Sequence, residues 1–246
     1  MNIQDPAPFP QMRAAYLRSI AKAWRDPAYQ KALAGASHNP LFPRGALDLL
    51  EREYKFKFPF NIKLSISDQE ALRPRFEPTY STGWIGFADD FKVYLPPAPS
   101  GKGEEGDPAS VLARYSQEFP SLLGQAQEEG IEAPDDFGNV GLITARLIAL
   151  IWQDEVTRKA VYAVDDARAL VQDTMDFIFP WNFRLKFVEA KVKGFQKSTT
   201  ADPYWEAFPR SEITLHLPMP PDDPDSKAVA IASYNATGGQ YPFTCT

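Results

Sequence analysis

Hydrophobic residues near the start of the chain recur at three- and four-residue intervals, a spacing that places them on one face of a helix. These residues are Met12, Tyr16, Ile20, Ala23 and Trp24. After this predicted helix, Asp26 and Pro27 have the order of an N-cap followed by proline at the first helical position. They predict a short helix that extends to Leu33, and the leucines after Arg44 predict a third helix up to Glu53.

The same order of elements returns in the second half of the chain. The helices predicted there span residues 143–152, 154–163 and 165–175. Asp154 occupies the place that Asp26 has in the first half, and Trp152 precedes it as Trp24 precedes Asp26. No proline follows Asp154, so the start of this helix is less sharply marked.

In both halves the helices are followed by segments in which apolar and polar residues alternate, the two-residue period of a half-buried strand. The predicted strands span residues 60–66 and 91–95 in the first half and 183–187 and 212–217 in the second. Pro96 and Pro218 follow the second strand of each half, and proline ends a strand because it cannot donate to the ladder. Each half therefore predicts helices followed by an antiparallel strand pair, and the fold class is α+β.

Four features occur in the same order in both halves, which favours a tandem duplication. Trp24 and Trp152 are 128 residues apart, Pro59 and Pro180 are 121 apart, Trp84 and Trp205 are 121 apart, and Leu95 and Leu217 are 122 apart. The extra residues of the first half are expected within 35–45, where prolines indicate an irregular loop. Because each repeat is small and has a strand pair to cover, the two tandem repeats are expected to pack as a pseudo-dimer.

The predicted organisation has four parts. They are a first repeat over residues 1–99, a linker and helical connector over 100–137, a second repeat over 138–234, and a flexible tail over 235–246. Proline and glycine dominate the linker, and the connector is predicted to be helical over 109–129 with an interruption at Pro120. Residues 228–234 are predicted to form a last strand or a buried run.

Composition narrows the class of protein. The chain has 246 residues with 44% hydrophobic and 13% aromatic residues, which argues against disorder. The net charge of -6 predicts no nucleic-acid binding. There is no apolar run long enough for a membrane-spanning helix, and the polar N-terminus lacks the pattern of a secretory signal. A cytoplasmic globular protein is therefore expected.

Conventional catalytic and metal sites find little support in the sequence. A single cysteine excludes an internal disulfide, and with two histidines it cannot build a Cys/His zinc site. His38 lies in a proline-rich loop and His216 in an alternating strand, so neither is expected to act as a catalytic base. The sequence also contains no phosphate-binding glycine loop. We therefore expect no catalytic residues, no metal and no cofactor.

The most reactive side chains lie in the tail. The single cysteine is Cys245, the penultimate residue, and Thr244 and Thr246 flank it. If an enzyme activates the preceding amide, the Cys245 thiol can attack the carbonyl carbon of Thr244 and close a thiazoline with loss of water. Threonine hydroxyls would give oxazolines in the same way. Gly238 and Gly239 form a small, flexible stretch that a protease can accommodate, which makes them a candidate cleavage site.

The residues alone leave a second interpretation of the tail open. Cys245 can be an incidental free thiol, or the tail can pack as an edge strand through Tyr241 and Phe243.

Residues 19–33 contain a recognisable pattern, Trp24-Arg25-Asp26-Pro27-Ala28-Tyr29, between two helices. The pattern resembles the leader segment shared by nitrile hydratase alpha subunits and the nitrile hydratase-like leader peptides of ribosomally made natural products. The resemblance covers roughly residues 12–67 and is weaker in the second half. It implies that Trp24, Asp26, Pro27 and Tyr29 are candidates for leader recognition by a modifying enzyme.

The cysteine count separates the two branches of this resemblance. Nitrile hydratase alpha subunits bind iron or cobalt through a Cys-x-x-Cys-Ser-Cys cluster, which this chain lacks, so hydratase activity is not expected. Residues 241–246 instead resemble the ending of large Burkholderia-type precursors of thiazole/oxazole-modified microcins (TOMMs). The resemblance implies a non-catalytic, bacteriocin-like precursor whose folded part is the leader.

The resemblance also implies the partner and the place of maturation. The partner would be a peptide-modifying enzyme, either a cyclodehydratase or an iron-dependent oxidase that rearranges the cysteine. Maturation is expected in the cytoplasm, with export of the processed product. Two alternatives are a non-catalytic scaffold whose repeats form a partner groove and, less favoured, a nitrile hydratase-like enzyme with carboxylate ligands or a partner's metal site.

Overall fold

The computed structural model describes residues 8–58, 62–81, 83–100, 106–122, 135–179, 183–192, 195–196, 204–205 and 208–236. The α-helices are α1 (Pro8–Ala23), α2 (Pro27–Gly35), α3 (Ala46–Tyr54), α4 (Pro108–Leu122), α5 (Asp135–Gln153), α6 (Glu155–Ala163), α7 (Arg168–Met175) and α8 (Lys227–Ala236). The strands are β1 (Lys63–Ser67), β2 (Arg75–Phe76), β3 (Trp84–Ile85), β4 (Asp90–Leu95), β5 (Arg184–Glu189), β6 (Phe195–Gln196), β7 (Tyr204–Trp205) and β8 (Glu212–His216). The predicted α+β class is confirmed.

Short turns complete the described elements. They are the 3-10 turns η1 (Ala36–His38), η2 (Glu70–Leu72) and η4 (Pro224–Ser226). The connector predicted over 109–129 contains α4, which continues past Pro120 to Leu122 without the predicted interruption.

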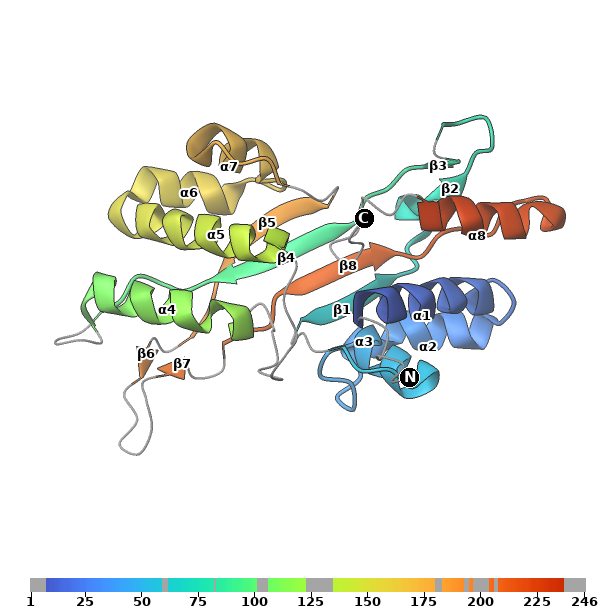
Figure 1. Ribbon diagram of the computed structural model, residues 1–246, viewed down its shortest axis with the longest axis horizontal. Helices are drawn as coiled ribbons and strands as arrows, with labels where there is room; N and C mark the ends of the chain where they lie inside the picture. Colours follow the sequence, from blue (N-terminus) through green and yellow to red (C-terminus); the bar gives the residue numbers. More distant parts are fainter. Residues whose placement is uncertain are drawn as a thin grey trace, which may run out of the picture.

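A four-stranded sheet with the order β1-β8-β4-β5 forms the centre of the protein (Figure 1). The two middle strands, β8 and β4, are antiparallel, whereas β1 pairs with β8 and β5 pairs with β4 in parallel. Each outer strand therefore comes from one half of the chain and its neighbour from the other half. The prediction of an antiparallel pair within each half is wrong, because alternation marks a strand with one buried face but carries no information on its partner.

The two parallel strand pairs, β1–β8 and β4–β5, are aligned at equivalent positions of the two halves. Lys63 pairs with Glu212 at the start of one ladder, and Asp90 pairs with Arg184 at the start of the other. Arg184 lies 121 residues after Lys63, and Glu212 lies 122 residues after Asp90, the spacings that also relate the sequence features of the two halves. At the middle of the sheet Phe91 pairs with Ile213, whose numbers differ by the same 122.

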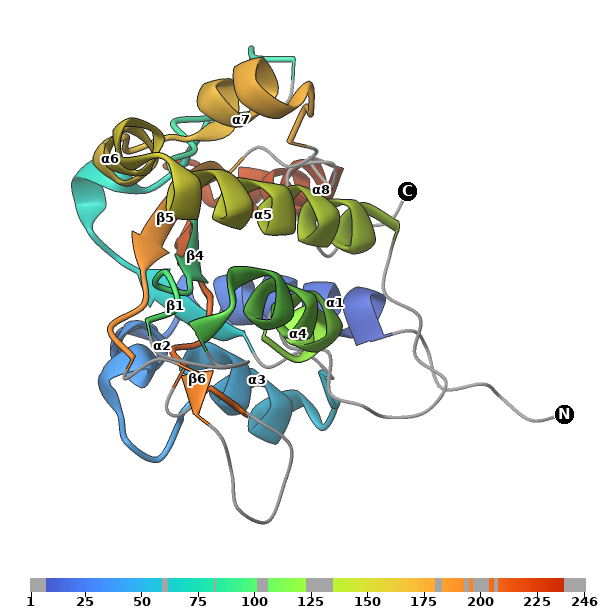
Figure 2. The ribbon, with the colours of Figure 1, turned by 90° about the vertical axis from the view of Figure 1, so that its left-hand side faces the viewer.

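Helices lie around the sheet in two groups, and α8, from the second half of the chain, lies beside α1 of the first half (Figures 1 and 2). Helices α1, α2 and α3 gather around β1, and α5 and α6 lie over β5 with α4 beside α5. Asp26 caps α2 by accepting a hydrogen bond from Tyr29 N at 3.0 Å. Asp154 caps α6 through Val156 N and Thr157 N, at 3.1 and 2.9 Å. Both predicted helix starts are confirmed, because a carboxylate cap suffices even without proline.

The apolar faces of the strands form the core. In β4 half-buried and buried residues alternate from Asp90 to Leu95, as predicted. The largest fully buried side chains are Trp84, Tyr115, Tyr234, Phe91, Phe183, Ile20, Leu33, Leu47, Leu50, Ile62 and Leu64. Burial of each such side chain stabilises the fold by about 1.5–3 kcal/mol. The side chain of Trp205, the sequence counterpart of Trp84, lies outside the described residues.

The segment predicted as a last strand or buried run, residues 228–234, is instead part of helix α8. Asp223 accepts a hydrogen bond from Asp225 N at 3.0 Å and caps the turn η4 that leads into the helix. Of this helix, Ala230 and Tyr234 are buried, four residues apart on one face. The strand prediction is wrong because alanines, which favour helix, separate the β-branched residues.

Searching the described part of the chain for a helix both long and apolar enough to cross a membrane finds none.

Candidate functional site at the base of residues 237–246

The residues predicted to be modified or cleaved lie outside the described residues. They are Thr244, Cys245, Thr246, Gly238 and Gly239. The structure does describe the place from which their segment continues, the end of α8 at Ala236. The site is therefore built from α8 and the elements that hold it.

Helix α8 is held by the β2–β3 hairpin. Trp84 Nε1 donates a hydrogen bond to the carbonyl oxygen of Ala230 at 2.9 Å. The ring of Trp84 also meets the ring of Tyr234 edge to face, with centroids 5.4 Å apart. Gly83 lies so close to the helix that a Cβ there would be 3.0 Å from the Cβ of Ser233, and its φ of +72° favours glycine. The hairpin and the helix therefore pack as one unit.

The last turn of α8 is also held by α1. The guanidinium of Arg13, on α1, donates a hydrogen bond to the carbonyl oxygen of Asn235. That carbonyl belongs to the last turn of the helix, where carbonyls lack intrahelical partners. The end of α8 is thus attached both to the hairpin and to α1.

An aromatic cluster links helix α8 and the β2–β3 hairpin to Trp24, the first residue of the motif at residues 24–29. Trp24, at the end of α1, stacks on Trp84 with a centroid distance of 6.4 Å and an interplanar angle of 24°. The other ring contacts of the cluster are Phe76–Trp84, Phe87–Tyr234 and Tyr16–Tyr234, at 5.5, 5.9 and 6.3 Å. Each such pair contributes about 0.5–1.5 kcal/mol beyond its buried area.

The candidates for leader recognition lie near this cluster. Trp24 is half-buried and its Nε1 donates to the carbonyl oxygen of Pro218 at 2.8 Å. Asp26 is the cap of α2, and Pro27 is exposed at the first position of that helix. Tyr29 is buried, and its hydroxyl shares a hydrogen bond with Ser19 Oγ at 3.0 Å. Burial raises the pKa of Tyr29 above its usual range. All except Pro27 thus hold elements together, and their role in recognition stays a prediction.

The tryptophan contact has a counterpart in the other half. Trp152 Nε1 donates to the carbonyl oxygen of Pro96 at 3.1 Å. Each tryptophan therefore bonds to the proline that follows the second strand of the opposite half. The sequence contained both tryptophans and both prolines, but no local signal pairs residues so far apart along the chain.

A buried ionisable pair that the sequence did not reveal lies beside the cluster. The Oδ1 of Asp89 accepts a hydrogen bond from His216 N at 2.7 Å and lies 3.4 Å from His216 Nδ1. Burial raises the pKa of Asp89, although the contacts with His216 oppose this shift. Burial also raises the pKa of Tyr16, and the nearby Tyr234 and Asp89 add to that increase. Asp89 and His216 are 5% and 3% exposed, so neither can contact a substrate from solution.

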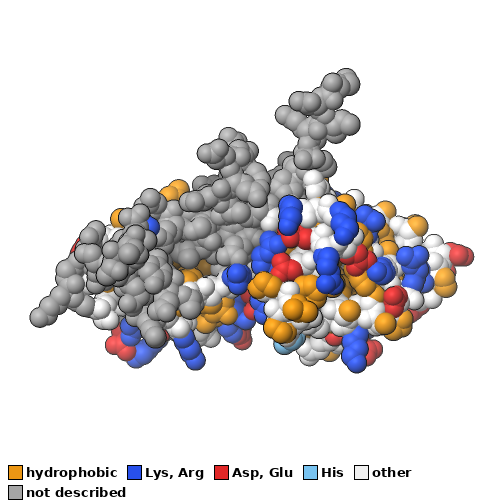
Figure 3. All heavy atoms as spheres, turned by 90° about the horizontal axis from the view of Figure 1, so that it is seen from below, with side chains coloured by type: hydrophobic (Ala, Val, Ile, Leu, Met, Phe, Trp, Pro, Cys, Tyr) orange, Lys and Arg blue, Asp and Glu red, His pale blue; other side chains and the backbone are white. Residues whose placement is uncertain are grey.

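Two surface features complete the description. Across the described residues there is no group of three or more His, Cys, Asp or Glu that could hold a metal ion. On the face shown in Figure 3, basic and acidic side chains are interspersed. Ion pairs among the described residues include Lys22–Glu53 at 2.5 Å and Arg44–Asp48 at 2.8 Å.

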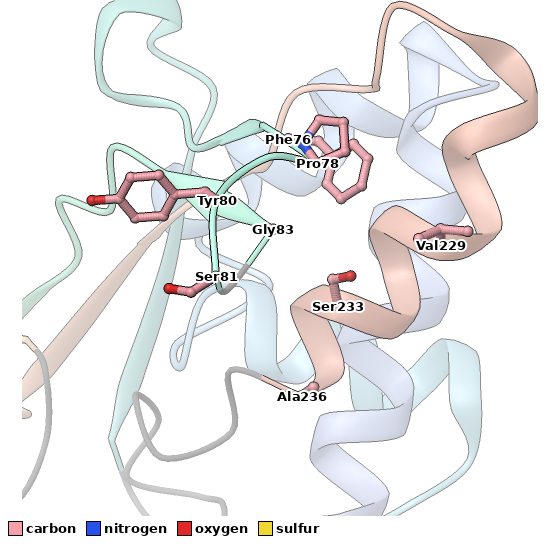
Figure 4. A pocket seen from close by; sticks show the side chains of 8 residues that line it. All are labelled: Phe76, Pro78, Tyr80, Ser81, Gly83, Val229, Ser233 and Ala236. Carbon is pink, nitrogen blue, oxygen red and sulfur yellow. The ribbon is translucent and has the colours of Figure 1, made fainter.

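A pocket of about 400 Å³ opens between the hairpin and α8 (Figure 4). Its lining residues are Phe76, Pro78, Tyr80, Ser81, Gly83, Val229, Ser233 and Ala236. Val229, Ser233 and Ala236 follow one another along the side of α8 that faces the hairpin. The pocket therefore reaches the residue from which residues 237–246 continue.

Comparison with known proteins gives one match. A family model described as "Ribosomal natural product, two-chain TOMM family" matches residues 8–123 and 135–242. The second segment includes Gly238 and Gly239 and ends before Thr244. No curated protein and no solved structure matches the chain.

Proposed function

Since the chain belongs to the two-chain TOMM family of ribosomal natural products, we propose that residues 8–236 are its folded leader and that residues 237–246 are the part that enzymes modify. The observation that carries this proposal is the family match over both halves of the fold, together with the single cysteine in the segment beyond α8. In this role the chain is a substrate and not a catalyst.

The modification we propose is ring closure at Cys245. The thiol sulfur forms a bond to the carbonyl carbon of Thr244, and the thiol and amide protons are lost. A cyclodehydratase transfers a phosphoryl group from a nucleoside triphosphate to the carbonyl oxygen, which leaves as inorganic phosphate while the amide nitrogen forms the thiazoline C=N bond. The peptide thus loses the atoms of one water, and the nucleoside triphosphate becomes the diphosphate. Thr244 and Thr246 are secondary sites, because a hydroxyl is a weaker nucleophile than a thiol that can ionise. An iron-dependent oxidase is the alternative enzyme for the same cysteine.

The attachment of α8 supports the role of residues 8–236 as leader. Trp84 and Arg13 hold the helix, so the segment begins at a defined point of the surface. Cys245 is nine residues beyond Ala236, and nine extended residues span up to about 30 Å. That length allows Cys245 to enter an active site while the leader stays folded. Cleavage at Gly238 and Gly239 would then release the product for export from the cytoplasm.

We further infer that the two halves are copies of one unit, arranged as a strand-exchanged pseudo-dimer. By strand exchange we mean that each strand of one half pairs with strands of the other half in the four-stranded sheet. The equal register of the two parallel ladders supports this, as do the two crosswise bonds from Trp24 and Trp152. The ion pairs Lys63–Glu212 and Arg184–Asp90, at 3.4 and 2.8 Å, relate to each other by the same spacings. The exchange makes one rigid leader from two small repeats.

Mass spectrometry after coexpression with a candidate cyclodehydratase, or with an iron-dependent oxidase, tests the proposed function. We expect the peptide that contains Cys245 to lose one water, and the variant C245A to lose none there. T237A is a matched control, because it changes a hydroxyl in the same segment outside the proposed sites. An unchanged peptide with every modifying enzyme would refute the proposal.

A further inference from the structure

The pocket between the β2–β3 hairpin and α8 presents apolar side chains to solvent. Val229 and Tyr80, on its two walls, are 59% and 58% exposed. Phe76 and Pro78 complete the apolar part of the lining, and Ser81 and Ser233 add hydroxyl groups (Figure 4). Exposed apolar side chains that surround a hollow often mark a place where another segment binds.

Charge indicates what kind of segment suits this pocket. The described residues that line it carry no charged side chain. Residues 237–246 carry none either, and they include two aromatic rings around a proline, Tyr241-Pro242-Phe243. An uncharged aromatic segment can enter such a pocket without desolvating an unpaired charge.

The length of chain between Ala236 and Tyr241 is sufficient for the segment to turn back along α8. Val229 and Ala236 are seven residues apart, which is about 10 Å along a helix. The four residues from Thr237 to Gln240 span up to about 13 Å. Two of the four are glycines, which adopt the conformations that a chain reversal needs. Tyr241 can therefore reach the far wall of the pocket at Val229.

We propose that this pocket binds Tyr241-Pro242-Phe243 of the chain's own segment. The rings then cover Phe76, Pro78 and Val229, and the adjoining residues Thr244 and Cys245 are held at the rim of the pocket. The inference rests on the proposed function for its purpose, which is to keep the reactive residues at a defined position until a modifying enzyme takes them.

The single cysteine permits a direct test in the full chain, because a nitroxide label on Cys245 needs no other change. NMR relaxation of the labelled protein should show strong broadening of the amides of Ser81, Gly83 and Ser233. The amide of Ser110, on α4 in the opposite group of helices, should broaden much less. Because the label stays tethered to Ala236, an undocked segment still broadens nearby amides, so the variant Y241A/F243A should weaken the broadening at Ser81 and Gly83 without removing it.

A matched pair of surface variants controls for unfolding. V229R places a charge in the pocket and should weaken the broadening to the level of Y241A/F243A, whereas V156R, at a position that is 76% exposed on α6, should leave it unchanged. Both variants should keep the dispersed amide spectrum of the folded protein. Equal broadening at Ser81 and Ser110, or pocket broadening that V229R does not weaken, would overturn the inference.

Two further measurements separate the other outcomes. Broadening in a mixture of nitroxide-labelled chains and isotope-labelled chains without nitroxide would assign the pocket to a second copy and overturn the proposal. Mass spectrometry on the unlabelled protein, coexpressed with a modifying enzyme, separates this inference from the proposed function. Water loss at Cys245 without pocket broadening refutes only the docking, and pocket broadening without any water loss refutes only the modification.

Discussion

The two crosswise tryptophan contacts predict how stability depends on the exchange of strands. W24F and W152F each remove one indole N–H that bonds to the carbonyl of the opposite half. Pro218 keeps a second donor, Arg73 Nη2 at 3.0 Å, so W24F loses mainly the ring contact with Trp84. We expect W24F to cost about 1–2 kcal/mol from ring packing and the net hydrogen bond.

The cost of W152F has a different source. Pro96 is buried, and removal of the indole donor leaves its carbonyl without that partner. A buried carbonyl that loses its hydrogen bond costs about 1–3 kcal/mol. The two sites share no partner, so the double variant W24F/W152F should lose about the sum of the single changes.

Urea unfolding followed by circular dichroism and by intrinsic fluorescence measures these changes. Because the sheet alternates strands from both halves, each variant should shift one common transition, with coincident midpoints for the two probes. The control V156A, at an exposed position, should leave the midpoint in place. Two separate transitions of which W24F shifts only one would refute the exchange, since each half would then fold by itself.

Other predictions follow from single contacts. A protease site introduced within residues 101–105 should give two fragments that elute together after cleavage and separate only in denaturant, as gel filtration can show, because neither fragment holds two adjacent strands of the sheet. D26A should lose about 1 kcal/mol of unfolding free energy by removing the cap of α2, whereas D26N should keep the cap. A fall in Cys245 modification with D26N at unchanged stability would support recognition of the Asp26 charge, and unchanged modification would contradict it. Burial raises the pKa of Asp89 above its usual 3.8, so its contribution to stability is present at low pH and lost as pH rises through the raised pKa. Between pH 3.8 and the raised pKa, D89N should lose less stability with rising pH than the unsubstituted chain, and equal slopes in urea titrations would refute this. G83V should destabilise the attachment of α8 by about 1–3 kcal/mol because its φ is positive and its Cβ would meet Ser233, which thermal unfolding and hydrogen exchange of α8 can measure.

Local patterns in the sequence were sufficient for much of the fold. Asp26 with Pro27 and Asp154 mark helix starts through a carboxylate that accepts the first free N–H groups, an interaction within four residues. Alternation likewise marks β4, since one face of the strand is buried. The hydrophobic pattern gave the wrong prediction for residues 228–234 of α8, because a short helix with one buried face has few apolar residues and these can also fit a strand.

For the site, the sequence singled out residue types without their surroundings. Trp24 belongs to a recognisable motif, but its stacking on Trp84 and its bond to Pro218 depend on residues 60 and 194 positions away. Asp89 carried no sequence signal, because its contact with His216 arises only where β4 and β8 meet. The pocket beside α8 likewise needs the hairpin and the helix to be placed together.

By itself, the sequence determined the α+β class and the equivalent spacing of features in the two halves, and it singled out Thr244, Cys245 and Thr246 as candidates for modification. These follow from local periodicity and from composition, which do not depend on long-range contacts. Only the tertiary structure decided which strands pair, because a half-buried strand fits any neighbour that covers the same face. It also decided that α8, from which residues 237–246 continue, is held by Trp84 and Arg13. The physical reason is that these contacts join residues between 94 and 222 positions apart, and their geometry exists only after strands of the two halves have paired.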